Sequence, residues 1–225
     1  MLLDIIRFGH VIGIALGLGL AIYADGRFLR ALSAPIRAVE LENLRAIHAH
    51  VVVAMALLWV TGLALLYART GFSLSEFAPK LYYKVGVVSV LTLNAALIAR
   101  KAMPKLEDHV GLSFFEMPLA VRMQLALIGA VSAACWLSLL ALGVFQSFKQ
   151  MGSEAIASVL QWFFFLPLSG ALGMALLAPA MFSAGRFVAR RHMGQPRRWP
   201  ALQSQPAVRS QPLYQPQPGF ERYHR

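Results

Sequence analysis

Charged residues are scarce in this sequence. They make up 14% of its 225 residues, whereas hydrophobic residues make up 58%. Because soluble globular domains contain roughly a quarter charged residues, this composition excludes an ordinary soluble domain and predicts an integral membrane protein. The only cysteine is Cys135, and a single cysteine excludes a disulfide bond within the chain.

The sequence also lacks the short motifs of soluble catalysis and metal binding. It contains no HExxH, CxxC, GxxxxGK[ST] or GxSxG pattern. No Asp or Glu lies in the middle of a long apolar segment. Ion and proton relays in membranes use such buried carboxylates, which argues against an ion-coupled pump. These absences favour a protein that is not an enzyme and that has no metal site.

What the sequence does contain is a series of apolar segments long enough to cross a bilayer, which takes about 20 residues of helix. These segments predict an all-α integral membrane protein, a bundle of five transmembrane helices within residues 1–185. The expected spans are residues 5–24, 48–68, 81–103, 123–148 and 157–184.

The basic residues predict the orientation of this bundle. Sixteen of the 21 Lys and Arg residues lie between the first and second spans, between residue 100 and the start of the fourth span, or after the fifth span. The positive-inside rule then places the N-terminus outside and the C-terminus in the cytoplasm. We expect these residues to contact anionic lipid headgroups rather than nucleic acid.

Residues 186–225 form a basic segment rich in proline and glutamine, which predicts an extended or disordered cytoplasmic tail. Its candidate partner-binding residues are Arg190, Arg191, Arg197 and Arg198.

The connection between the first two spans has the pattern of an amphipathic helix. Residues 33–35, Ser-Ala-Pro, predict a helix start, with proline in the first turn. Arg37 with Glu40, and Glu42 with Arg45, are spaced as i,i+3 ion pairs. We therefore expect the second helix to start early and to run along the cytoplasmic surface before it enters the bilayer.

One ionisable side chain, His10, lies inside the apolar run FGHVIGIALGLGL of residues 8–20. Gly9, Gly13 and Gly17 recur every four residues in this run and form two overlapping GxxxG patterns, which let another helix come close. His10 shares a helix face with Gly13 and Gly17, so we expect it to face a neighbouring helix. It is either a neutral, hydrogen-bonded histidine or a ligand for a cofactor.

Haem b is one candidate cofactor. His48 opens the second span at the opposite end from His10, and the two residues differ in depth by roughly 20 Å. A haem at His10 would therefore need a methionine, or a ligand from another subunit, as its second axial ligand.

A second candidate is a quinone, because other polar and aromatic residues are expected at the depth of His10. Lys84 begins the third span, and Trp59 lies in the outer half of the second. Together they suit a quinone headgroup, a lipid phosphate or a carboxylate. The alternative is an ordinary interface, where lysines extend towards water and aromatic residues form a belt. In the fifth span, Gly170 and Gly173 predict a close helix contact.

The segments LLWVTGLALLY around residues 58–67 and YYKVGVVSVLTLNAALIARKAMPKL (82–106), with the first helix that bears His10, resemble a broad group of small bacterial multipass proteins. That group is similar to the copper-resistance D-type and cytochrome-b-like membrane families. The resemblance implies a multi-pass protein of the bacterial inner membrane. Haem-bearing relatives pair histidines on facing helices, whereas here only His10 lies inside a span.

Together these features predict a non-catalytic accessory, scaffold or assembly subunit of a larger membrane complex, bound to other membrane-protein subunits. The first alternative is a redox subunit that binds haem or quinone near His10. A weaker alternative is a small transporter.

Overall fold

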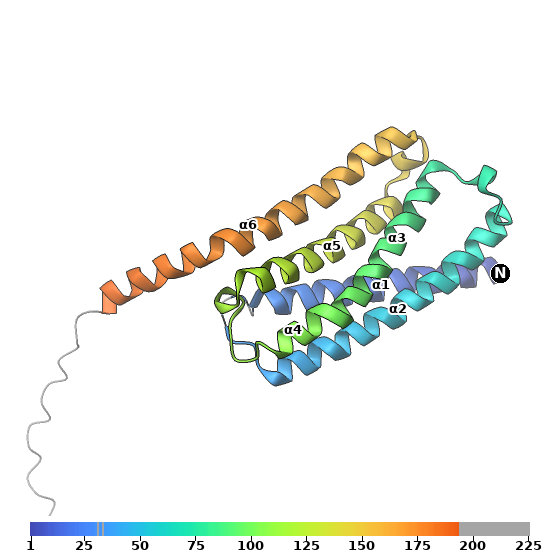
Figure 1. Ribbon diagram of the computed structural model, residues 1–225. Coiled ribbons are helices and arrows are strands. Elements are labelled where there is room, and N and C mark those ends of the chain that lie inside the picture. Colours follow the sequence, from blue (N-terminus) through green and yellow to red (C-terminus); the bar gives the residue numbers. More distant parts are fainter. Residues whose placement is uncertain (31, 33, 194–225) are drawn as a thin grey trace, which may run out of the picture. The chain divides into compact units, whose positions relative to one another are not determined.

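The computed structural model describes residues 1–30, 32 and 34–193, with residues 178–193 as helix backbone. The chain divides into two units, Met1–Gly185 and Arg186–Arg225, and the first contains the helical bundle. Its described residues form helices joined by short turns (Figure 1). The long helices are α1 (Leu2–Arg30), α2 (Ala38–Thr70), α3 (Pro79–Leu97), α5 (Leu119–Val144) and α6 (Ser153–Met193). The short elements are η1 (Leu74–Glu76), η2 (Ile98–Ala102), α4 (Met103–Glu107), η3 (Phe114–Glu116) and η4 (Gln146–Lys149).

The described residues include five helical stretches that are long and apolar enough to cross a membrane, which confirms the predicted all-α fold with five spans. The third stretch joins α3, η2 and α4 into one continuous span. The stretches are Leu2–Arg30, Ala38–Thr70, Pro79–Glu107, Leu119–Val144 and Ser153–Leu177. The chain is therefore a multi-pass membrane protein; its orientation stays a prediction.

The described helices extend past the expected spans at every end except one, the C-terminal end of α5. α5 ends at Val144 rather than at residue 148, because Phe145 is extended and η4 follows it. The turn at η4 brings Phe148 into the core, where it is 2% exposed, so this apolar side chain is buried without a longer helix. α6 starts earlier and ends later than residues 157–184.

The start of α2 corrects the expectation of a helix start at residues 33–35. α2 begins at Ala38, and Ile36 before it is held by a distant loop instead. The N–H of Ile36 donates to the carbonyl of Leu112 (3.1 Å), and the N–H of Gly111 donates to the carbonyl of Ile36 (2.9 Å). These two bonds satisfy the backbone of Ile36 in a non-helical conformation.

Of the two ion pairs expected at the start of α2, one forms. Arg37 pairs with Glu40 at 3.1 Å, and the Glu40 carboxylate also accepts from the backbone N–H of Arg37. Arg45 pairs with Glu107 of α4 rather than with Glu42. A partner from a neighbouring helix therefore replaces the local one.

The third span contains one π-helical turn, η2, directly before α4. Pro104 explains its position, because proline has no N–H to donate to the carbonyl of residue 100 and its ring crowds that carbonyl. The wider π turn accommodates this local defect without ending the span.

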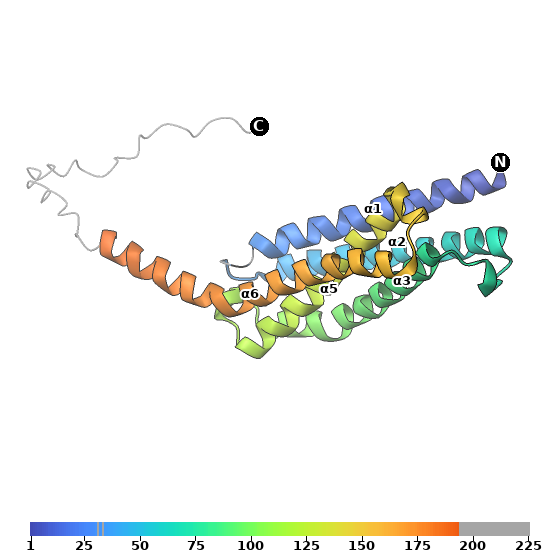
Figure 2. The same ribbon diagram turned by 90° about the horizontal axis from the view of Figure 1, so that it is seen from above.

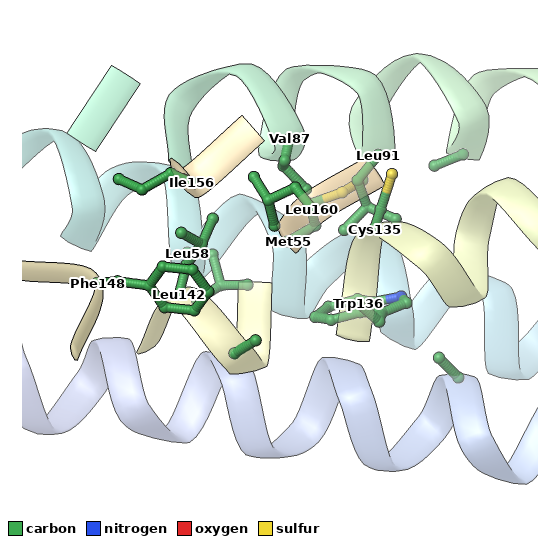
Figure 3. Close-up of a cluster of buried hydrophobic side chains, with 13 residues drawn as sticks. Met55, Leu58, Val87, Leu91, Cys135, Trp136, Leu142, Phe148, Ile156 and Leu160 are labelled. Carbon is green, nitrogen blue, oxygen red and sulfur yellow. The ribbon is translucent and has the colours of Figure 1, made fainter. Parts of the chain in front are cut away.

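Two buried clusters hold the helices of this unit together. The first contains side chains from α1, α2, α3, α5, η4 and α6, with Trp136 of α5 directed towards α1 (Figure 3). The second lies near the α1–α2 and α4–α5 connections and includes Phe114, which is fully buried. Between the two clusters, Asn94 Nδ2 of α3 donates a hydrogen bond to the carbonyl of Ile128 on α5 (3.1 Å).

α1 and α2 lie side by side over much of their length (Figures 1 and 2). Of the glycines predicted to pack, Gly9 and Gly13 face α2, and Gly17 faces α5. A Cβ on Gly9 would lie 3.5 Å from Thr61 Cγ2, and one on Gly13 would lie 3.1 Å from Leu58. A Cβ on Gly17 would overlap the indole ring of Trp136. These three glycines therefore serve packing within this chain.

We predict that Gly17→Ala destabilises the bundle, because the added Cβ would overlap the ring of Trp136, a side chain of the core that is 2% exposed. Overpacking of this kind costs about 1–3 kcal/mol. The matched control is Gly19→Ala on the same helix, where a Cβ would meet no atom within 4 Å. Thermal unfolding in detergent micelles should show a lower Tm for Gly17→Ala and an equal or higher Tm for Gly19→Ala. Equal melting of Gly17→Ala and the wild type would contradict this packing.

Candidate functional site

A cavity of about 590 Å³ lies between α1, α2, α3 and α5, towards the end of the bundle that holds the N-terminus. Its volume falls within the range of sites that bind small molecules. Most of the wall is formed by leucine, valine and isoleucine side chains. The side chains with polar groups are Arg7, His10, Trp59, Arg69, Lys84 and Trp136.

His10 is anchored to α2 on one side of this cavity. Its Nδ1 lies 2.9 Å from the hydroxyl oxygen of Thr61, and that hydroxyl donates to the carbonyl of Leu57 at 2.6 Å. Gly62 makes room for the ring, since a Cβ at this position would lie 3.4 Å from His10 Cε1. The expectation that His10 faces a neighbouring helix is confirmed, and that helix is α2 of the same chain.

Trp59 forms an aromatic part of the wall. Its indole N–H donates to the hydroxyl of Thr92 on α3 at 2.9 Å, and that hydroxyl donates to the carbonyl of Val88 at 2.8 Å. The indole N–H is therefore already satisfied by the protein. What Trp59 can offer a ligand is its ring surface, which suits stacking with another ring.

Lys84 is a basic residue of this region that pairs with no carboxylate in the part of the chain that the structure describes. Among the described residues, no carboxylate lies within ion-pair distance of Lys84 or Arg69. An oxygen that accepts hydrogen bonds, or an anion, would be stabilised here.

Arg7 also lines the cavity, but its guanidinium already forms an ion pair. Its guanidinium lies 3.2 Å from the carboxylate of Asp4, which also pairs with the N-terminal ammonium at 3.1 Å. These groups are exposed, so their ion pairs contribute little to stability. Arg7 is thus less available to a ligand than Lys84.

The structure brings the predicted residues His10, Trp59 and Lys84 from three helices to the wall of one cavity. Sequence reasoning did not identify Arg69 or Gly62 as part of this site. In the sequence, Gly62 is marked only by its place directly after the polar residue Thr61. Its role beside the histidine ring depends on how α1 and α2 align, which the sequence does not show.

The two histidines of α2 do not join His10. His48 precedes Thr61 by thirteen residues on α2, which is about 20 Å along a helix. The ring of His50 bonds to its own helix, at the carbonyl of Ala46 (2.6 Å). Within the described part of the chain, no three His, Cys, Asp or Glu side chains gather into a group that could hold a metal ion.

The predicted packing glycines of α6 have a different environment from those of α1. A Cβ on Gly170 or Gly173 would meet no atom within 4 Å. Neither residue is at a close helix contact with the described residues of this chain, and contact with another protein stays a prediction.

A second, smaller cavity of about 230 Å³ lies near the α1–α2 connection. Its basic lining residues are Arg27, Arg30 and Arg37, and its one acidic residue is Glu40, which pairs with Arg37. Of the predicted tail residues, Arg197 and Arg198 lie outside the described residues. Arg190 and Arg191 belong to the backbone of α6, and their side chains are not described.

Comparison with known proteins gives no relative for this chain: no protein family, no curated protein and no solved structure matches it. The resemblance to copper-resistance D-type and cytochrome-b-like proteins therefore stays an expectation from the sequence.

Proposed function

We propose that this chain is a membrane subunit that binds a quinone in the cavity beside His10. The observation that carries the proposal is the convergence of His10, Lys84 and Trp59 on a cavity whose other walls are largely apolar. A quinone combines a polar ring with an apolar tail, and the cavity has a surface for each part. The quinone supplies the electron chemistry, and the protein binds and orients it.

Each of the three residues has a distinct part in this proposal. Trp59 offers a ring surface, since its N–H is bonded to Thr92. Lys84 has no ion-pair partner among the described residues. Its ammonium group donates hydrogen bonds to one of the two oxygens attached to the quinone ring. Nδ1 of His10 is bonded to Thr61, and in this proposal the second ring nitrogen bonds to the ligand. A phosphate would instead call for several fixed donors, and Arg7 and Arg69 are both exposed.

We predict that the purified protein binds decylubiquinol, the reduced form of a quinone, saturably under anaerobic conditions, with quenching of tryptophan fluorescence as the readout. His10→Ala and Lys84→Met should each weaken binding by about five- to tenfold, because each removes a hydrogen bond in a poorly solvated site. The matched control is Lys101→Met, which removes an exposed lysine of η2 that does not line the cavity. Unchanged binding in both cavity variants would contradict the proposal.

We also propose that the chain is an accessory subunit of a larger complex in the bacterial inner membrane, and that α6 contacts another membrane protein. The supporting observation is that Gly170 and Gly173 face open space on a helix whose Trp162 and Leu166 are strongly exposed. Membrane helices place small residues where another helix packs closely.

We predict that Gly170→Leu and Gly173→Leu reduce the size of the complex that carries this chain on native gels of mildly solubilised membranes. The added side chains would hold a partner helix away from α6. Gly86→Leu is the control, because Gly86 of α3 also faces open space. A wild-type chain that migrates as a monomer, or a complex indifferent to both α6 substitutions, would count against this role.

We further propose that the second cavity binds the phosphate of an anionic lipid headgroup. Three arginines line it, whereas its one carboxylate, that of Glu40, is already paired with Arg37. Arginine binds phosphate through several hydrogen bonds at once.

We predict that phosphatidylglycerol raises the Tm of the micelle-solubilised protein above that in phosphatidylcholine, because a ligand of the folded state stabilises it. The double substitution Arg27→Gln and Arg30→Gln should remove this difference. Arg100→Gln, an exposed arginine of η2 outside the cavity, should retain it. An unchanged lipid effect in the double variant would refute this proposal.

A further inference from the structure

We infer that the cavity beside His10 selects the reduced, hydroxyl-bearing form of its ligand, a quinol, over the oxidised quinone. This inference rests on the proposed quinone-binding function and goes beyond it, because it states which redox form the protein prefers. It follows from the hydrogen bonds that connect His10, Thr61 and the backbone of α2.

The proton of the Thr61 hydroxyl has a fixed position. The hydroxyl oxygen lies 2.6 Å from the carbonyl oxygen of Leu57, and two oxygens at this distance need a proton between them. A carbonyl has no proton, so the hydroxyl is the donor. Because a threonine hydroxyl carries a single proton, Thr61 has only lone pairs left for any other partner.

The Thr61 hydroxyl in turn fixes the tautomer of His10. Nδ1 of His10 lies 2.9 Å from this oxygen, which can only accept, so Nδ1 carries the proton and donates. In a neutral imidazole the second nitrogen, Nε2, then has a free lone pair. None of the ion pairs among the described residues involves His10.

A lone pair at Nε2 distinguishes the two redox forms of a quinone. A quinol carries two hydroxyl groups, and one of them can donate to Nε2 while Lys84 donates to an oxygen of the ring. A quinone carries carbonyl oxygens, which only accept. A carbonyl oxygen facing Nε2 would leave two acceptors opposed without a proton.

The oxidised form could bond to His10 only if the proton moved from Nδ1 to Nε2. That change would require Thr61 to turn its hydroxyl towards His10 and to give up its bond to the Leu57 carbonyl. The Thr61 side chain is 8% exposed, so water has little access to replace the lost bond. The arrangement in α2 therefore opposes binding of the quinone by about tenfold relative to the quinol.

The test compares the affinities of decylubiquinol and decylubiquinone for the purified wild type, for Thr61→Val and for Thr70→Val, under anaerobic conditions. Valine keeps the shape of threonine but removes the acceptor for Nδ1, so either tautomer of His10 becomes accessible. Thr70 is the matched control, since its hydroxyl also donates to a carbonyl of its own helix, that of Leu66 at 2.9 Å, and it does not line the cavity. We expect a preference for the quinol of about tenfold in the wild type and in Thr70→Val, and a ratio near one in Thr61→Val.

Nitrogen NMR of labelled histidine gives a second readout that does not depend on the Thr61 variant. The wild-type signals that are absent in His10→Gln should show a protonated Nδ1 and an unprotonated Nε2. The reverse tautomer would overturn the inference.

The outcomes separate this inference from the proposed function. If the wild type binds both forms equally, or if Thr61→Val keeps the full preference, selection by Thr61 and His10 is refuted while quinone binding stands. If the wild type binds neither form, both are refuted.

Discussion

The close approach of α1 to α2 is the constraint on which the cavity depends. Gly13 permits it, because a Cβ there would lie 3.1 Å from Leu58 and 3.4 Å from the carbonyl oxygen of Ala54. A side chain at this position would push the helices apart and with them His10 and Thr61, whose hydrogen bond is 2.9 Å long. On the opposite helix, Gly62 provides the space for the imidazole. The small residues that let α1 and α2 pack closely therefore also set the position of the one histidine of α1.

The apolar surroundings impose a second constraint, on the threonines. A hydroxyl within a membrane helix has no water to bond, so it donates to a carbonyl one turn earlier in its own helix. Thr61 and Thr92 both do so, to the carbonyls of Leu57 and Val88. Each hydroxyl is then an acceptor towards the neighbouring helix, where Thr61 receives the N–H of His10 and Thr92 receives that of Trp59. The same local bond therefore orients both aromatic groups of the site.

The sequence was sufficient for features that depend on composition and on helical spacing. Five spans follow from the length of apolar helix that a bilayer requires, and the face shared by His10 and its glycines follows from the helical repeat. Features that depend on tertiary contacts could not be predicted. The pairing of Arg45 with Glu107 and the start of α2 at Ala38 are each decided by residues more than 60 positions apart in the chain. The cavity is of this kind too, because Arg69 and Gly62 acquire their places only when α2 is aligned with its neighbours.

Trp136 connects the packing of the bundle to the cavity. Its ring occupies the space that Gly17 leaves on α1, and the same side chain lines the cavity. Its indole nitrogen has no hydrogen-bond partner among the described residues, an arrangement that costs roughly 1–3 kcal/mol for a buried donor. The apolar contacts of the ring, which is 2% exposed, must offset this cost. A ligand that packs against Trp136 would add to those contacts, so binding in the cavity and the stability of the α1–α5 contact are thermodynamically linked.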